Sequence, residues 1–147
     1  MPKIVNALGG VMVGQAKQDA DQRCKVFVYG TLKRGFANHY FLRNAHFFGM
    51  AKTVKMYGLY VDEFPSVYAW DAVSPIRGEV YDIDMLTLRC LDGVEGHPRF
   101  SRREEIEVLL DSGQLLWVWF YFYPQRGKRL ISNGEFNLST GLAQEMD

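Results

Sequence analysis

Two short segments of the chain carry residue types that could perform chemistry together. The first is Tyr29-Gly30-Thr31-Leu32, which follows an apolar run that begins at Lys25. A buried strand that breaks into a glycine-punctuated turn can present several backbone N–H groups toward one point, where they bind an anion or a developing oxyanion. The second segment holds Glu95, a carboxyl group that could transfer protons. We therefore expect the turn to bind a ligand and Glu95 to be the candidate acid/base.

Glu95 lies between a valine and a glycine, in a segment that also holds Asp92 and His97. Burial would raise the pKa of the Glu95 carboxyl and let it accept and return a proton near neutral pH. From the residue pattern alone a solvated loop charge is the more common outcome, because charged side chains are mostly exposed. Asp92 could bond to nearby loop N–H groups, and Pro98 after His97 indicates a structural turn.

Other chemistries have weaker support in the sequence. The chain has no G-x-x-x-x-G-K-[ST] loop and no G-x-G-x-x-G with an acidic residue at Rossmann distance. Its two cysteines, Cys24 and Cys90, lack metal-ligand spacing, and free thiols indicate a reducing, cytoplasmic compartment. Cys90 could be a nucleophile, but it lies in an apolar helical stretch where cysteine usually packs as a small core residue. The Lys33-Arg34 pair could contact a ligand or belong to a solvated turn.

Length and charge exclude some classes of partner. The 147 residues predict one domain over 23–147, preceded by a poorly ordered extension over 1–22. Seventeen basic and seventeen acidic residues cancel, so no overall field favours nucleic acid or an anionic membrane. No apolar run is long enough to span a membrane. The extension could also serve as a weak organellar presequence, against which its acidic residues argue.

The elements that position these segments are mostly strands. Apolar and aromatic runs bounded by turn residues predict strands at 25–29, 47–51, 55–61, 66–70, 76–83, 106–110 and 115–123. The last of these is apolar on both faces, which predicts a central strand, and the tail from Pro124 predicts little regular structure. The clearest helix runs from the N-cap Asp84 to Gly93, and a shorter one begins over 39–43.

These elements predict an α+β fold, in which a mixed, largely antiparallel curled sheet closes into a small β-barrel with one or two flanking helices. Gly49 and Gly58 interrupt their strands, and such glycines permit the bulges and tight curvature that a small barrel needs. A parallel βαβ arrangement is disfavoured because the chain has too few helices of the required length.

The ordered motifs of the chain resemble those of the gamma-glutamylcyclotransferase-like family. Tyr29-Gly30-Thr31-Leu32 is similar to the family's Tyr-Gly-[Thr/Ser]-Leu signature. Further matches follow in the family's order, at Gly78-Glu79-Val80-Tyr81, Leu91-Asp92-Gly93-Val94-Glu95-Gly96, Trp119-Phe120-Tyr121-Phe122-Tyr123 and Ile131-Ser132-Asn133-Gly134-Glu135-Phe136. The likeness covers residues 25 to 136. Phe100 stands where a tyrosine is common, and Phe136 replaces the usual tryptophan.

The resemblance implies a cofactor- and metal-independent enzyme of the carbon–nitrogen lyase or acyltransferase type. It implies a small-molecule gamma-glutamyl substrate, which would release 5-oxoproline and a free amine when its own α-amine attacks its γ-carbonyl. The resemblance makes Glu95 the general acid/base. It gives substrate binding to the Tyr29-Gly30-Thr31-Leu32 loop, supported by an aromatic hydroxyl from Tyr121 or Tyr123.

Three alternatives remain open at this stage. Glu79 is a second carboxylate in the motif set, although a strand position between Gly78 and Tyr81 favours a bond to the backbone or to an arginine. The same fold could bind a small metabolite without catalysing a reaction. Nucleic-acid binding has no electrostatic footprint in this neutral chain. We expect a monomer or a weak dimer.

Overall fold

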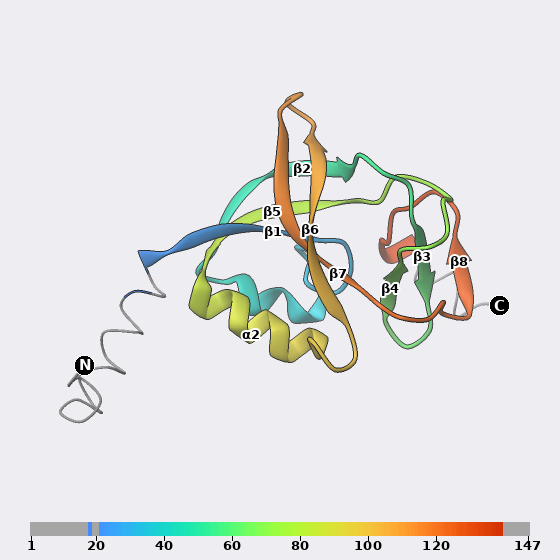
Figure 1. Ribbon diagram of the computed structural model, residues 1–147, viewed down its shortest axis with the longest axis horizontal. Helices are drawn as coiled ribbons and strands as arrows, with labels where there is room; N and C mark the ends of the chain where they lie inside the picture. The colour runs from blue at the N-terminus through green and yellow to red at the C-terminus, as the bar shows by residue number, and fades with distance from the viewer. Residues whose placement is uncertain (1–17, 19–20, 140–147) are drawn as a thin grey trace.

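A closed barrel of five strands forms the centre of the computed structural model, which describes residue 18 and residues 21–139 (Figure 1). Around the barrel the strands follow the order β1 (Arg23–Val28), β5 (Arg77–Asp84), β2 (His46–Thr53), β6 (Arg102–Leu110) and β7 (Leu115–Phe122). Neighbours in this order pair antiparallel, and a parallel pairing of β1 with β7 at Val26 and Trp119 closes the ring. The predicted α+β barrel is confirmed.

A second, smaller sheet lies beside the barrel, at the right of Figure 1. It consists of β4 (Pro65–Tyr68), β3 (Gly58–Val61) and β8 (Arg129–Ile131), all antiparallel. The sequence predicted the first two strands but not β8, which lies in the tail that was expected to have little regular structure. Three residues are too few to show a strand period, so β8 depends on the edge that β3 offers.

Helices η2 (Ala37–Leu42, a 3-10 helix) and α2 (Met85–Glu95) lie on one side of the barrel (Figure 1). The predicted N-cap of α2 is confirmed, because the Asp84 carboxylate accepts a hydrogen bond of 2.7 Å from the Thr87 N–H. The predicted end at Gly93 is wrong. The helix continues to Glu95 and ends at Gly96, whose φ of +74° suits a glycine C-cap. Glu95 therefore belongs to the last helical turn and not to an irregular loop.

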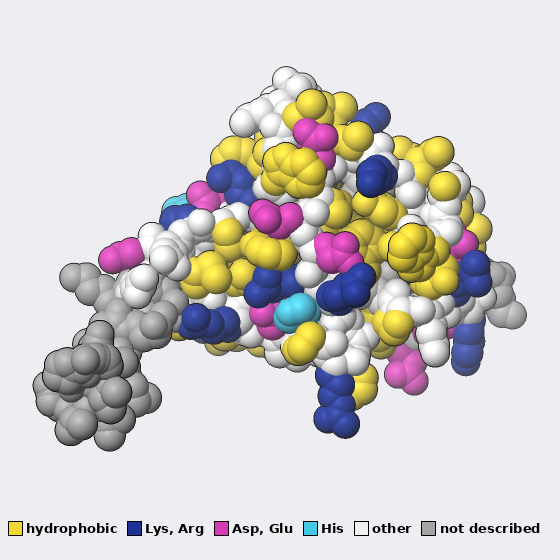
Figure 2. All heavy atoms as spheres, in the orientation of Figure 1, with side chains coloured by type: hydrophobic (Ala, Val, Ile, Leu, Met, Phe, Trp, Pro, Cys, Tyr) yellow, Lys and Arg dark blue, Asp and Glu magenta, His cyan; other side chains and the backbone are white. Residues whose placement is uncertain are grey.

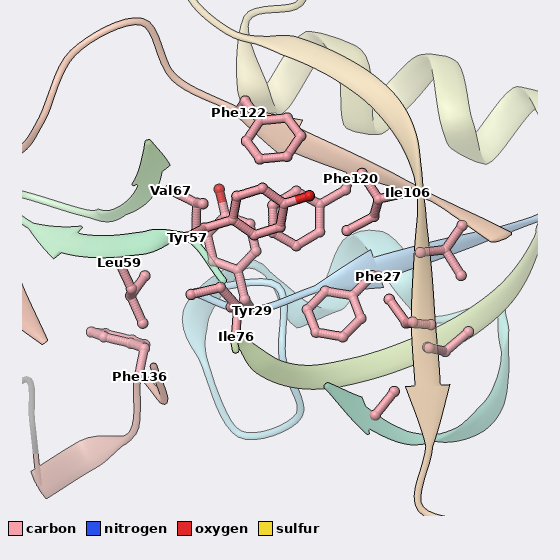
Figure 3. Packing of buried hydrophobic residues seen from close by; sticks show 14 of the residues in the cluster. Phe27, Tyr29, Tyr57, Leu59, Val67, Ile76, Ile106, Phe120, Phe122 and Phe136 are labelled. Atoms are coloured by element: carbon pink, nitrogen blue, oxygen red, sulfur yellow. The ribbon is translucent and has the colours of Figure 1, made fainter. Parts of the chain in front are cut away.

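Alternate residues of the barrel strands belong to two hydrophobic clusters, one inside the barrel and one between the barrel and α2. Phe27 and Phe120 point into the barrel, where their rings stack at 5.4 Å among the side chains drawn in Figure 3. Val26, Val28 and Tyr121 belong to the other cluster, which includes Leu88 and Leu91 of α2. Because successive side chains of a strand point to opposite faces, Phe120 of β7 points into the barrel and Tyr121 points toward α2.

The prediction that 115–123 is a central strand is confirmed, because β7 pairs with both β6 and β1. Leu115 and Trp117 are nevertheless exposed near the tip of the β6–β7 hairpin, since helix α2 packs on β7 around Trp119 and Tyr121. The expectation that Cys90 packs as a core residue is wrong. Cys90 is exposed, because the buried face of α2 is set by Leu88 and Leu91. On the face seen in Figure 2, basic and acidic side chains are interspersed among hydrophobic ones.

The described residues contain no helix that is long and apolar enough to cross a membrane. The extension predicted over 1–22 lies, apart from residues 18, 21 and 22, outside the described part of the chain. The bulge expected at Gly49 is confirmed by a shift in the β2–β5 register between Phe47 and Gly49.

Gly78 of β5 offers a test of how tightly the barrel is packed. A Cβ added there would lie 2.7 Å from the Phe27 ring and would collide with the Val28 carbonyl oxygen. We expect Gly78→Ala to lower the free energy of unfolding by about 1–3 kcal/mol, the usual cost of overpacking a core. Urea denaturation measures this change.

Gly93→Ala is the matched control, because nothing lies within 4 Å of its added methyl group. Alanine is the better helix former, so this variant should be as stable as the wild type or more stable by up to about 1 kcal/mol. Equal stability of the two variants would contradict the packing described for Gly78.

Candidate active site

The parallel pairing of β1 with β7 brings two predicted segments to the same edge of the barrel. The turn that follows β1 and the end of β7 meet there, beside the last turn of α2. A cleft of about 840 Å³ opens at this edge. Its walls include all the residues predicted for the site, namely Tyr29, Gly30, Thr31, Leu32, Glu95, Tyr121 and Tyr123. A volume of this size is typical of small-molecule sites.

The Glu95 carboxyl has an unusually high pKa for an acidic side chain. Removal from water raises its pKa from 4.5 to about 7, and the hydrogen bond from the Tyr123 hydroxyl only partly opposes this shift. That hydroxyl lies 3.3 Å from Glu95 Oε1. A carboxyl group with a pKa near 7 can both accept and donate a proton under neutral conditions.

Tyr121 and Tyr123 both reach α2, but their hydroxyls have different partners. Residues two apart in the chain lie on the same face of an extended segment, and residues three apart in a helix are neighbours. The Tyr121 hydroxyl accordingly donates to Asp92 Oδ1 at 2.7 Å, whereas that of Tyr123 donates to Glu95. Only Tyr123 therefore touches the candidate acid/base directly.

Asp92 is part of an ion pair that supports the helix end. The Arg103 guanidinium donates to both of its carboxylate oxygens, at 2.7 and 3.1 Å, and lies 4.3 Å from the centre of the Trp119 ring. The expectation that Asp92 binds loop N–H groups is thus replaced by contacts with Arg103 and Tyr121. This network links α2, β6 and β7 directly behind the cleft.

Tyr29 lines the cleft, but its hydroxyl is engaged in a hydrogen bond within the protein. It donates to the Tyr121 carbonyl oxygen at 2.7 Å and is buried, and this burial raises the pKa of the phenol well above 10. The Tyr29 hydroxyl therefore fixes the end of β1 to the end of β7. Its ring packs on Phe120 at 5.0 Å.

The turn after β1 keeps backbone donors available. Among the hydrogen bonds within the described residues, none uses the N–H groups of Gly30, Thr31 or Leu32. Close packing fixes the backbone here, because a Cβ on Gly30 would lie only 2.5 Å from the Pro65 ring. Three successive peptide units with free N–H groups, at the wall of a cleft, suit an anionic ligand.

Buried polar contacts anchor the far side of this turn. Glu79 Oε1 accepts from the Arg34 N–H and from the Tyr81 hydroxyl, each at 2.9 Å. The Lys33 ammonium donates to the Phe136 carbonyl oxygen, and its burial lowers the pKa of the amine. Lys33 is thus not solvated. Glu79 lies outside the set of residues that line the cleft, which supports a structural role.

Several cleft residues were not anticipated from the sequence. Phe64 lies in the turn between β3 and β4, and Pro65 begins β4. Asn38 comes from η2, and Arg99 and Phe100 come from the loop after α2. Apart from Phe100, which the sequence marked as a departure from the family pattern, they carry no signal in the sequence, because the packing of the second sheet on the barrel edge depends on tertiary contacts. Within the described residues, no three His, Cys, Asp or Glu side chains are grouped closely enough to hold a metal ion.

Comparisons with known proteins agree on one family. The family model described as gamma-glutamyl cyclotransferase, AIG2-like, matches residues 26–138. A Methanocaldococcus jannaschii protein named "Putative gamma-glutamylcyclotransferase" is 43% identical over 112 residues, which cover 76% of this chain and 93% of that protein. The gamma-glutamylaminecyclotransferase of Rattus norvegicus is 38% identical over 95 residues, covering 56% of this chain and 62% of its own length.

A solved structure of similar fold is the crystal structure of an AIG2-like protein from Mus musculus. It superposes with a TM-score of 0.71 at 27% sequence identity, covering 79% of this chain and 89% of that chain.

The raised pKa of Glu95 predicts a characteristic pH dependence of stability. Between about pH 4.5 and 7 the folded protein holds a proton that the unfolded chain has released, so the contribution of Glu95 to stability falls as the pH rises through this range. Glu95→Gln removes the titration. We expect the free energy of unfolding of Glu95→Gln, relative to that of the wild type, to increase by about 3 kcal/mol between pH 4.5 and 8.

Urea denaturation of both proteins at a series of pH values measures this difference. A difference between the two proteins that stays constant across the series would show that the Glu95 carboxyl titrates normally.

Proposed function

Because the chain belongs to the gamma-glutamyl cyclotransferase, AIG2-like, family, we propose that it releases 5-oxoproline and a free amine from a gamma-glutamyl amide. The observation that carries the proposal is one cleft with two complementary parts. Glu95, with a pKa of about 7, lies on one wall, and the free backbone N–H groups of residues 30–32 lie on another. The first part suits proton transfer, and the second suits an anion.

The reaction needs no nucleophile from the protein. The α-amine of the substrate attacks the γ-carbonyl carbon of the same molecule, and the new C–N bond closes a five-membered ring. The C–N bond to the leaving amine then breaks. A cleft that holds the substrate folded, with its amine against its carbonyl, supplies the proximity that such a step requires.

Glu95 would move the protons in this sequence. As a carboxylate it accepts a proton from the attacking α-ammonium, and as a carboxylic acid it returns that proton to the departing amine nitrogen. The pKa of about 7 makes both forms accessible near neutral pH. The Tyr123 hydroxyl, 3.3 Å from Glu95 Oε1, orients the carboxyl and favours its ionised form.

The N–H groups of Gly30, Thr31 and Leu32 would hold negative charge on the substrate. They can bind the α-carboxylate of the glutamyl group or the oxyanion of the tetrahedral intermediate. The anchoring of this turn by Glu79 and Lys33 keeps the donors in place, since both side chains are buried.

Replacement of Glu95 by glutamine tests the proposed proton transfer. Glu95→Gln keeps the size of the side chain but cannot accept a proton, so we expect 5-oxoproline release to fall by at least about 100-fold, as is usual for loss of a general acid/base. Binding of 5-oxoproline, followed by calorimetry, should be retained. The assay uses a panel of gamma-glutamyl dipeptides and gamma-glutamyl amines.

Glu79→Gln serves as the matched variant, because glutamine retains a carbonyl oxygen for the Arg34 N–H and the Tyr81 hydroxyl. It should lose far less activity than Glu95→Gln. The opposite order would assign proton transfer to Glu79.

Tyr123→Phe tests how the carboxyl is tuned. Loss of the hydroxyl removes the interaction that lowers the pKa of Glu95, so that pKa should rise. At low pH, kcat/KM falls because Glu95 is already protonated before the substrate binds. In Tyr123→Phe this fall should occur at higher pH than in the wild type.

Tyr121→Phe is the control, because the Tyr121 hydroxyl donates to Asp92 and not to Glu95. It should lower the stability by about 1 kcal/mol without moving the pH at which kcat/KM falls. An equal displacement of this pH in both variants would contradict the separate roles of the two hydroxyls.

A further inference from the structure

Arg99 lies at an unassigned position on the rim of the cleft. It is one of four residues, with Phe100, Tyr123 and Pro124, that line both the cleft and a second groove of about 830 Å³. Arg99 therefore marks the side on which the cleft opens into that groove. It comes from the loop that directly follows Glu95 at the end of α2.

The loop that carries Arg99 is held by its own backbone. The His97 N–H donates to the Asp92 carbonyl oxygen at 2.9 Å, and the Phe100 N–H donates to that of Gly96 at 2.7 Å. His97 Nδ1 in turn accepts from the Arg103 N–H at 3.1 Å. These bonds tie the loop to the helix end and to β6, so the position of Arg99 relative to Glu95 is fixed.

The Arg99 guanidinium has no acidic partner among the described residues. It lies over the Phe100 ring, whose centre is 5.4 Å away. The other cation that lines the cleft, Arg126, forms an ion pair with Asp71 at 2.6 Å. A carboxylate entering this side of the cleft would thus meet Arg99 as the available cation.

We propose that Arg99 determines specificity by binding a carboxylate on the leaving-group side of the substrate. This inference rests on the proposed function. The glutamyl end of the substrate would occupy the N–H groups of residues 30–32, whereas the amine that leaves must point to the open rim. Arg99 follows Glu95, the residue that would protonate the leaving nitrogen, by four residues, and both line the cleft.

Arginine suits this task because its planar guanidinium binds a carboxylate with two parallel hydrogen bonds. The substrates favoured by such a residue are gamma-glutamyl conjugates of amino acids, in which the leaving amine carries a carboxylate. Conjugates of simple amines, which lack that group, would gain nothing from Arg99.

Matched substrate pairs test this assignment. The first pair is gamma-glutamyl-alanine and its C-terminal amide. The second pair is Nε-gamma-glutamyl-lysine and the compound in which the lysine α-carboxylate is replaced by an amide. Release of 5-oxoproline is measured for all four compounds. In at least one pair the wild type should prefer the free carboxylate by about tenfold in kcat/KM, which is the usual scale for one charge-assisted contact at a partly exposed site. Arg99→Gln should abolish that preference, mainly through KM, and Arg99→Lys should restore part of it.

The pair that shows the preference indicates how far the carboxylate lies from the reacting nitrogen.

Arg102→Gln is the control, because Arg102 lies outside the cleft and pairs with Glu104. It should leave the preference unchanged.

Two results would overturn the assignment of Arg99. An equal loss of kcat/KM for acid and amide in Arg99→Gln would mean that Arg99 binds the glutamyl part, and an unchanged kcat/KM for both compounds would mean that it binds neither. Absence of 5-oxoproline from all four compounds with the wild type would instead overturn the proposed function, and the assignment with it.

Discussion

The parallel pairing of β1 with β7 is the constraint on which the site depends. It closes a ring of otherwise antiparallel strands, and it places the ends of both strands at one edge of the barrel. The Tyr29 hydroxyl, which donates to the Tyr121 carbonyl oxygen, holds these ends together in the core. A donor-rich turn and an aromatic strand end, 92 residues apart in the chain, thereby become opposite parts of one cleft. An open sheet of the same strands would separate them.

Helix α2 supplies the candidate acid/base at this edge. Its buried leucines fix the rotation of the helix against the barrel, so that Asp92 and Glu95 both face β7. The two carboxyl groups are three residues apart, but their surroundings differ. Asp92 is paired with Arg103, whereas Glu95 has the Tyr123 hydroxyl and little water, which raises its pKa to about 7. This difference of environment leaves Asp92 in a structural ion pair and makes Glu95 the candidate acid/base.

The sequence predicted most of this arrangement but not all of it. Strand periodicity, the Asp84 cap and the ordered motifs led to the barrel and to seven of the residues that line the cleft. The extent of α2 was missed, because Gly93 is compatible with a helix and only the left-handed backbone at Gly96 requires a glycine. The separate partners of Tyr121 and Tyr123 could not be predicted, since they depend on how α2 rotates against β7. Arg99 and β8 carry no local signal, and their places follow from tertiary packing.

The central claim is that one cleft holds the substrate's anion on the turn after β1 and its reacting nitrogen beside Glu95. A crystal structure with 5-oxoproline bound tests it most directly, because the product retains the carboxylate and the ring nitrogen of the reaction. We predict that the product carboxylate accepts hydrogen bonds from N–H groups of residues 30–32 and that the ring N–H lies within hydrogen-bonding distance of the Glu95 carboxyl. A product bound away from both, in the second groove or on the outer face of β7, would contradict the account.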